Sequence, residues 1–214
     1  MSAITIIGGH GKVALHLARI LTADGHQVSS VFRNPDHADE VAATGARPVV
    51  ADIESSSVDE LAGLLSGQDA VVFSAGAGGG DPARTYAVDR DAAIRVVDAA
   101  GQAGARRFVM VSYFGAGADH GVPESNSFYH YAEAKAAADA HLRGTDLNWT
   151  ILGPGSLTLD PGTGRIAVGK EGKVSREDVA AVAAATLAED ATIKRTIEFN
   201  NGDTPIAEAI RAGR

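Results

Sequence analysis

The stretch Gly8-Gly9-His10-Gly11-Lys12-Val13-Ala14 decides how this chain folds. It follows residues 3–7, an apolar and β-branched run that predicts a buried parallel strand. After it come residues 13–21, whose apolar side chains recur at helical spacing and predict a helix. A strand, a glycine turn and a helix in this order are the opening of a βαβ nucleotide-binding unit.

The small residues of this turn have expected roles in holding a dinucleotide. Gly8 permits the tight turn, Gly11 leaves room for a pyrophosphate against bare backbone, and Ala14 lets the helix pack closely on the strand. The helix N-terminus adds free N–H groups and the positive end of its dipole. A strand–helix turn without a ligand is the alternative, and the remaining pattern argues against it. The expected cofactor contacts here are Gly8, Gly9, His10, Gly11, Lys12 and Val13.

Strands and helices alternate along the rest of the chain. Strands are expected at residues 28–32, 48–51, 70–73, 108–111 and 147–152, with a hairpin at 165–168 and 172–174 and an edge strand at 196–199. Helices are expected at 36–43, 58–65, 82–100, 128–143, 176–189 and 205–212. This alternation predicts an α/β fold, a Rossmann-type doubly wound parallel sheet. One domain is expected, 1–214, with a dinucleotide-binding core at 1–152 and a C-terminal part at 153–214 that completes the substrate side.

Composition narrows the class of protein. The chain has 214 residues, 45% of them apolar, which is enough for one good core. It has no cysteine, so disulfides, thiolate metal sites and cysteine nucleophiles are excluded. The net charge of −8 argues against nucleic acid as a partner, and no apolar run is long enough to span a membrane. A cytoplasmic protein is expected, and the sequence does not indicate the oligomeric state.

The end of the second strand bears on the choice of nucleotide. An NAD-binding chain usually has a carboxylate here, about twenty residues beyond the glycines, for the ribose 2′-hydroxyl. This chain has Arg33, 22 residues after Gly11, and no acid between the start of the second strand and Asp36. An arginine can bind a 2′-phosphate bidentately, and Lys12 can add charge, so NADP(H) is preferred and NAD(H) stays possible. A solvated arginine at a loop tip is the alternative.

Three residues have the chemistry for carbonyl reduction. Ser112 ends the fifth strand, and Tyr131 and Lys135 lie four apart on the next helix, hence on one face. The lysine is expected to lower the pKa of the tyrosine and to fix the nicotinamide ribose, while the serine holds the substrate oxygen. Taken alone, the pair is an ordinary helix surface pair. Tyr129 is a weaker candidate because Glu133, four residues on, would raise its pKa.

The remaining groups with chemical potential are less informative. His10, His120, His130 and His141 are scattered and predict no metal site. Asp52, at the end of the third strand, is expected either to accept from the adenine amino group or to cap a turn. The irregular segment 114–126 is long enough to indicate a flap over a site.

Taken together, these motifs make the chain resemble an atypical short-chain dehydrogenase/reductase of the NAD(P)-binding, NmrA-like group. The resemblance implies that Ser74, Ala75 and Gly76 line the adenosine and pyrophosphate side, with Asp52 and Ile53 beside them. It implies further that Pro154, Gly155 and Ser156 approach the nicotinamide. The motifs that carry it, besides the first turn, are Arg33-Asn34-Pro35, Ala51-Asp52, Ser74-Ala75-Gly76, Val111-Ser112, Tyr131 with Lys135, the run 149–155 and the run 175–180.

The chain departs from the family in two places. The first turn lacks the Thr-Gly start of ordinary reductases, and Gly153 stands where related chains often have arginine. The resemblance leaves three functions open: an NADPH-dependent reductase of a small carbonyl, quinone or flavin-like acceptor, a non-catalytic NADP(H)-binding redox sensor, and a nucleotide-sugar epimerase or dehydratase. The third is disfavoured because the chain after the sixth strand is short for a second nucleotide. Tyr131 and Lys135 in register favour the enzyme over the sensor.

Overall fold

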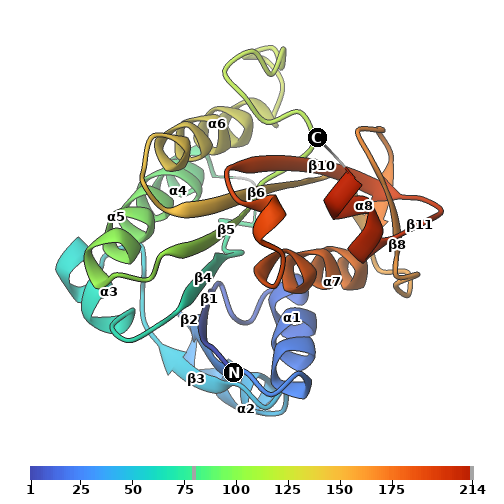
Figure 1. Ribbon diagram of the computed structural model, residues 1–214. Helices are drawn as coiled ribbons and strands as arrows, with labels where there is room; N and C mark the ends of the chain where they lie inside the picture. Colours follow the sequence, from blue (N-terminus) through green and yellow to red (C-terminus); the bar gives the residue numbers. More distant parts are fainter. Residues whose placement is uncertain (79–80, 213–214) are drawn as a thin grey trace.

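The computed structural model describes residues 1–78 and 81–212. Its main sheet has the strand order β11-β8-β10-β6-β5-β4-β1-β2-β3 (Figure 1). From β3 to β10 all neighbouring strands are parallel. β8 pairs antiparallel with both of its neighbours, β10 and β11. This arrangement confirms the Rossmann-type doubly wound sheet. The strands are β1 (Ala3–Ile7), β2 (Gln27–Phe32), β3 (Arg47–Val50), β4 (Ala70–Phe73), β5 (Arg107–Val111), β6 (Asn148–Pro154), β8 (Arg165–Val168), β10 (Arg195–Asn201) and β11 (Thr204–Pro205).

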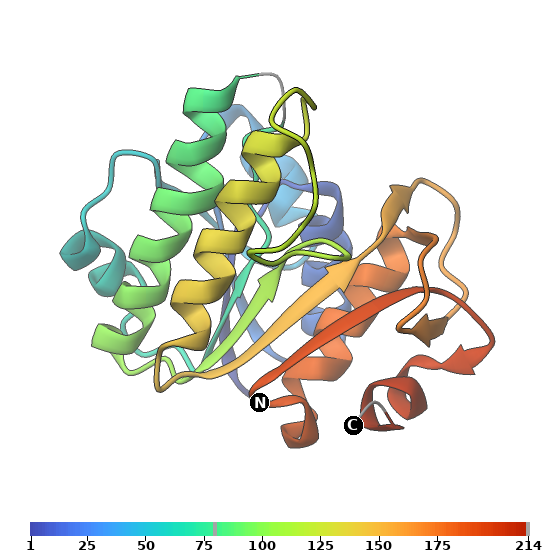
Figure 2. The ribbon, with the colours of Figure 1, turned by 90° about the horizontal axis from the view of Figure 1, so that it is seen from above.

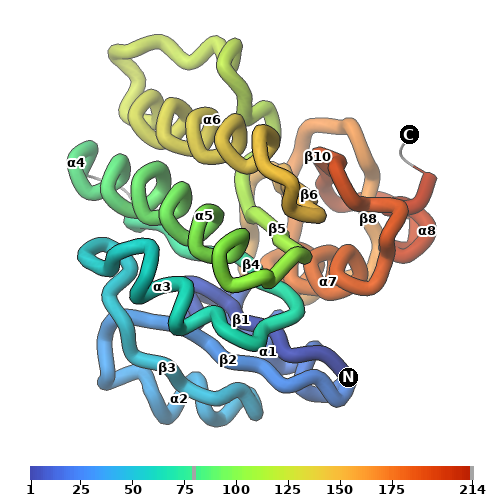
Figure 3. The backbone as a smooth tube through the Cα atoms, turned by 60° about the vertical axis from the view of Figure 1, so that its left-hand side comes forward, coloured from blue at the N-terminus to red at the C-terminus, as the bar shows by residue number. Residues whose placement is uncertain are grey.

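Helices cover both faces of the sheet. Figures 2 and 3 show α3, α5 and α6 side by side on one face, and Figure 1 places α1 and α7 on the other. In the described ranges, none of the helices is both long and apolar enough to cross a membrane. The helices are α1 (Lys12–Ala23), α2 (Ala38–Ala42), α3 (Val58–Leu64), α4 (Pro82–Thr85), α5 (Ala93–Ala103), α6 (Tyr129–Arg143), α7 (Arg176–Leu187) and α8 (Ile206–Ala212), with 3₁₀ turns η1 (Pro35–His37) and η3 (Asp190–Thr192).

The central strands β1, β2, β4, β5 and β6 contribute side chains to two cores, because successive side chains point to opposite faces. In β4, Ala70 and Val72 pack in the core beneath α1 and α7, and Val71 and Phe73 pack in the core beneath α3 and α5. A central strand of this kind is buried on both faces, which explains why it reads as a continuous apolar run. Packing in the two cores fixes the position of these strands along their own axes, and therefore the edge of the sheet at which their carboxyl ends meet.

The helix expected at 82–100 is present but not uniform. Its middle, η2 (Tyr86–Ala92), is π-helical, between α4 and α5. The helix continues to Ala103 and ends at Gly104, whose φ of 76° permits the left-handed cap. A π-helical turn is rare and occurs often at functional sites. It places Asp89 in the interior, where that residue is 1% exposed.

The expected hairpin at 165–168 and 172–174 is wrong, and so is the edge position of 196–199. β8 pairs antiparallel with β10, whereas β9 (Lys173–Ser175) pairs parallel with β7 (Ser156–Thr158) in a separate sheet. The side chain of Asn200 bonds to the loop between β8 and β9, since its Nδ2 donates to Lys170 O at 2.6 Å. β10 therefore lies between β6 and β8 rather than at the edge.

Candidate active site

Three cavities lie along the carboxyl ends of the parallel strands, where ligands bind in sheets of this kind. Their volumes are about 330, 870 and 740 Å³. Gly76 lines both the first and the second cavity, and Phe128 and Tyr131 line both the second and the third. The three cavities are therefore neighbours, in a row that runs from the glycine turn to the end of β6.

The glycine turn is shaped by contacts that only glycine allows. Gly8 has a φ of +85°, and an added Cβ would lie 2.6 Å from the backbone of Ala75. An added Cβ on Gly9 would lie 2.5 Å from Ser30 Cβ. Gly11 is the N-cap of α1 and offers no side-chain cap, so the first-turn N–H groups of the helix are open to a ligand. The turn therefore fits a pyrophosphate.

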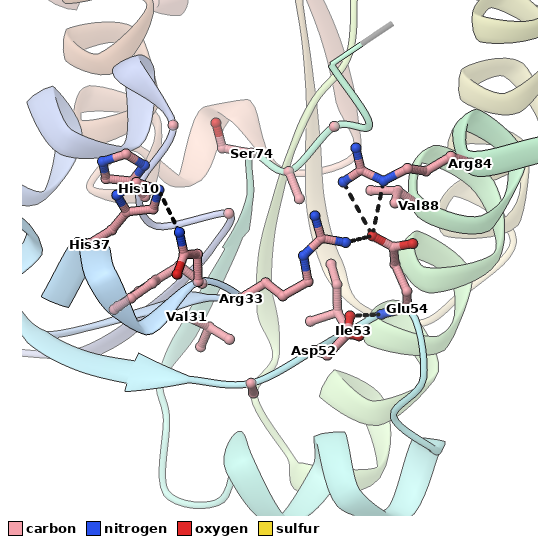
Figure 4. Close-up of a pocket in the computed structure, with 17 residues that line it drawn as sticks. His10, Val31, Arg33, His37, Asp52, Ile53, Glu54, Ser74, Arg84 and Val88 are labelled. Carbon is pink, nitrogen blue, oxygen red and sulfur yellow. Dashed lines mark hydrogen bonds and ion pairs between the residues drawn. The ribbon is translucent and has the colours of Figure 1, made fainter. Parts of the chain in front are cut away.

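The first cavity collects most of the residues expected on the nucleotide side. It lies between the glycine turn and the segments that follow β2, β3 and β4 (Figure 4). The expected residues that line it are Gly8, His10, Gly11, Arg33, Asp52, Ile53, Ser74, Ala75 and Gly76.

Three residues of the turn lie elsewhere. Gly9 is buried beneath the cavity against β2, and Val13 is buried in the core. Lys12 is exposed on the first turn of α1 and does not line the cavity. Lys12 and Val13 contribute backbone N–H groups to the open first turn of α1, so cofactor contact at these three positions stays a prediction.

Arg33 does not stand alone at the cavity. Its Nη1 donates to Glu54 Oε1 at 2.7 Å, and Arg84 approaches the same oxygen at 3.3 Å (Figure 4). Sequence reasoning about the second strand missed Glu54, because this carboxylate follows the third strand. The signal was available: β2 and β3 are parallel neighbours, so residues just beyond their carboxyl ends meet. Glu54 can accept from a ribose 2′-hydroxyl, which keeps NAD(H) open.

Two further side chains of this cavity have partners within the protein. Asp52 Oδ1 accepts from the backbone N–H of Glu54 at 3.0 Å, which is the turn-capping alternative. His10 stacks on His37 with ring centroids 3.6 Å apart and bonds to Glu40 at 2.5 Å. Ligand atoms of this trio lie within 4.8 Å of one another. Because the stacked rings direct their lone pairs into separate parallel planes, the geometry supports a stacked pair more than a metal centre.

The third cavity collects the residues expected beside the nicotinamide. Ser112, Tyr131, Pro154, Gly155 and Ser156 line it. The space beside Gly153 is filled, because an added Cβ would lie 3.0 Å from Glu198 Cγ and 3.1 Å from Tyr113 O. As β6 is packed here, position 153 has little room for an arginine side chain.

Lys135 departs from its expected position. It is 0% exposed and lines none of the three cavities. Its Nζ donates to Val111 O at 2.9 Å and contacts Met110 Sδ at 3.4 Å. Burial lowers its pKa, although Asp139 and Asp89 oppose the shift. The structure therefore places Lys135 beneath the third cavity, and its contact with a nicotinamide ribose stays a prediction.

Tyr131 shows the opposite of the expected pKa shift. Burial raises its pKa above the ordinary value, and Asp89 and Asp139 raise it further. Its ring lies 5.6 Å from that of Tyr113 and 5.1 Å from that of Phe128. The expected lowering by Lys135 is wrong, because burial of the phenol dominates and the charges of Asp89 and Asp139 act in the same direction.

The pKa of Tyr129 is raised, as expected. Burial is the main cause, and Glu133 contributes through its charge. Tyr129 lines none of the three cavities, whereas Tyr131 lines two. The pKa of both tyrosines is raised, so it is the position that favours Tyr131 over Tyr129.

Two buried carboxylates beside the site were missed by sequence reasoning. Asp89 lines the second cavity, and its Oδ2 accepts from Ala77 N at 3.0 Å. Asp139 Oδ2 accepts from Ser112 Oγ at 2.6 Å. Burial raises the pKa of both groups. For Asp139 a signal existed, because it lies one helical turn beyond Lys135 on the same face.

The segment 114–126 borders the third cavity and projects beyond the N-terminal end of α6 (Figure 3). His120 ties it down: its Nε2 lies 2.7 Å from Glu133 Oε1 on α6, and its Nδ1 accepts from Val122 N at 3.0 Å. The segment is therefore held in place at its middle. Its action as a flap stays a prediction.

Comparison with known proteins agrees with this geometry. The profile of a family described as NAD(P)H-binding matches residues 8–190. The chain belongs to this NAD(P)H-binding family. In Bacillus subtilis, the protein named "Uncharacterized sugar epimerase YhfK" is 35% identical over 213 residues, which cover 97% of this chain and 98% of that protein.

Solved structures give the same assignment. A Bacillus halodurans protein, whose proposed activity is that of an NAD-dependent epimerase/dehydratase, has 33% identity and a TM-score of 0.90, covering 98% of this chain and 99% of its own. The oxidoreductase ylbE of Lactococcus lactis has 27% identity and a TM-score of 0.88, covering 99% and 96%. The resemblance to NAD(P)-binding atypical short-chain dehydrogenases/reductases is confirmed. The finer NmrA-like assignment stays a prediction.

Proposed function

We propose that the protein is an NADP(H)-dependent reductase that transfers a hydride to a small carbonyl, quinone or flavin-like acceptor. The observation that carries the proposal is the row of three neighbouring cavities, with the glycine turn lining the first and Ser112 and Tyr131 lining the third. When bound, the nicotinamide would supply the hydride. Residues that line the first cavity would hold the adenosine and pyrophosphate, and Pro154 to Ser156 would flank the nicotinamide.

Tyr131 is the proton donor in this proposal. Its phenol is protonated at neutral pH, as an ordinary tyrosine is, since its pKa is raised rather than lowered. It can give that proton to an acceptor oxygen that gains charge as the hydride arrives. Ser112 and Tyr131 together would hold the acceptor oxygen, since both line the third cavity.

A turnover screen tests this proposal. Purified protein with NADPH is assayed against a panel of aldehydes, ketones, quinones and flavins, with consumption of NADPH as the readout. A nucleotide-sugar panel is assayed beside it, because the Bacillus subtilis relative is named a sugar epimerase. Turnover of a sugar without net NADPH consumption would favour the epimerase. Tight NADPH binding without any turnover would favour a redox sensor.

Arg33 should give NADPH an advantage over NADH, because its guanidinium can bind the 2′-phosphate bidentately. Calorimetric titration should show tighter binding of NADPH, and Arg33→Ala should narrow the difference by about 1–3 kcal/mol. Arg47→Ala serves as a control, because Arg47 bonds to Ser29 and does not line the nucleotide cavity. Equal affinities in the unmodified protein would remove the argument.

Glu54 should weaken the preference for NADPH over NADH, because its carboxylate forms ion pairs with the guanidinium groups of both Arg33 and Arg84. Glu54→Gln frees both arginines for the 2′-phosphate and keeps the shape of the side chain. NADPH is expected to bind about fivefold tighter, a modest change because the pair is partly exposed. NADH should not gain. A gain shared by both nucleotides would show that Glu54 does not compete for the 2′-position.

A further inference from the structure

Asp139 is fully buried, and only one of its two carboxylate oxygens has a hydrogen-bond partner among the described residues. It lies on α6 and is 0% exposed. Its Oδ2 accepts from Ser112 Oγ at 2.6 Å. Its Oδ1 is buried and has no hydrogen-bond partner within residues 1–78 and 81–212. An ionised carboxylate in such a place leaves one charged oxygen unsatisfied, whereas a protonated carboxyl group requires fewer acceptor bonds.

The charges around Asp139 are unbalanced. Lys135 and Arg143, on the same helix, lower its pKa, as does the bond from Ser112. Burial outweighs them and raises the pKa above its ordinary value. The Lys135 ammonium also faces Asp89, from the π-helical turn, so one positive charge serves two carboxylates.

The other facing groups do not supply a positive charge. Tyr131 and Tyr113 approach Asp139 from α6 and from the end of β5, and the pKa of each is raised by its proximity. Both phenols are neutral at ordinary pH. The surroundings as a whole therefore favour a proton on Asp139.

The proton on Asp139 determines what Ser112 can offer to the cavity. A serine hydroxyl has one proton to donate and two lone pairs. If Asp139 is ionised, the Ser112 proton is committed to it, and only lone pairs face the third cavity. If Asp139 is protonated, it can donate to Ser112 Oγ, and the Ser112 proton is free to point into the cavity. A carbonyl oxygen only accepts hydrogen bonds, so only the second state suits a carbonyl substrate.

We propose that Asp139 is a positioning residue whose protonation decides whether Ser112 presents a hydrogen-bond donor or an acceptor to the substrate. The inference rests on the proposed reductase function, for which the donor state is the productive one. It assigns to Ser112 a polarity that changes with pH. An alcohol product, which can donate, is accommodated by the acceptor state.

Infrared spectroscopy tests the proposal without any substrate. The carbonyl stretch of a protonated carboxyl group is recorded for the unmodified protein from pH 4 to pH 9, and the spectrum of Asp139→Asn is subtracted. We expect a band that persists into the pH range where ordinary aspartates are ionised. Ser112→Ala should shift this band, because the carboxyl group loses its hydrogen-bond partner. Asp98→Asn, on the exposed surface of α5, is the control and should leave the band unchanged.

Two infrared results would overturn the proposal. The first is a spectrum of Asp139→Asn that matches the unmodified protein at every pH above 5, because Asp139 would then be an ordinary carboxylate. The second is a band that does not respond to Ser112→Ala, because Asp139 would then hold a proton without acting on Ser112.

A pH profile adds a functional readout. Reduction of a carbonyl probe by NADPH should fall as the pH rises through the pKa of Asp139. In Asp139→Asn the amide can donate to Ser112 permanently, so this dependence should disappear while turnover at low pH is retained. Persistence of the same pH dependence in Asp139→Asn would contradict the proposal. If the unmodified protein reduces no probe, the reductase function fails, and the infrared results alone decide the role of Asp139.

Discussion

Gly11→Val is expected to abolish dinucleotide binding while the protein still folds. The backbone of Gly11 has φ −60° and ψ 146°, values that valine adopts readily. An added Cβ would lie 3.1 Å from Gly8 O, a contact that a small shift relieves. The isopropyl group would, however, fill the space in front of the first-turn N–H groups, where the pyrophosphate is expected. The affinity for NADPH should fall more than about 100-fold, or about 3 kcal/mol.

Calorimetric titration with NADPH measures the loss, and circular dichroism with thermal unfolding shows that the fold is kept. Gly8 and Gly9 are unsuitable for this test, since a side chain there would collide with protein backbone or with β2. Gly101→Ala is the matched control, because no atom lies within 4 Å of the added Cβ. It should bind NADPH normally and gain up to about 1 kcal/mol of stability. Normal binding by Gly11→Val would mean that the pyrophosphate is held elsewhere.

Much of the fold follows from local pattern, since the apolar runs of the central strands and the helical periodicities between them are decided within a few residues. β4 is an example: four apolar residues in a row predict a strand covered on both faces, and both cores are present. The hairpin failed because its partner choice is not local. The strand at 173–175 pairs with β7 instead of β8, and the loop between β8 and β9 is bonded to Asn200, from a distant segment.

The candidate site, like the fold, has parts that local sequence predicts and parts that depend on distant segments. The glycine turn and the residues after β4 reach the nucleotide cavity as expected, because their place follows from strand order. Glu54 and Asp139 were missed because their effect depends on which neighbours the fold brings to Arg33 and Ser112. The predicted direction of the Tyr131 pKa shift was wrong for a related reason. The spacing to Lys135 is visible in the sequence, but the burial of the phenol and its nearness to Asp89 and Asp139 depend on how η2 and α6 pack together.

Tyr131→Phe is expected to reduce carbonyl turnover strongly with little effect on cofactor affinity. The substitution keeps the ring contacts with Tyr113 and Phe128 and removes only the hydroxyl. If this hydroxyl gives the proton, reduction of an aldehyde or ketone should fall by about 10²–10⁴-fold, the range for general acid catalysis. Acceptors that draw their proton from water, such as quinones or flavins, should lose less. The comparison of the two acceptor classes therefore separates proton transfer from hydride transfer.

Tyr129→Phe provides the control on the same helix. Tyr129 has the same chemistry and a raised pKa, but it lines none of the cavities, so its loss should leave turnover unchanged. Steady-state kinetics with NADPH and a carbonyl probe, together with calorimetric NADPH affinities, measure both variants. Undiminished carbonyl reduction by Tyr131→Phe would remove the tyrosine from the proton path. Of Ser112, Tyr131 and Lys135, only Ser112 would then remain as a candidate proton donor at the third cavity, since Lys135 is fully buried and does not line it.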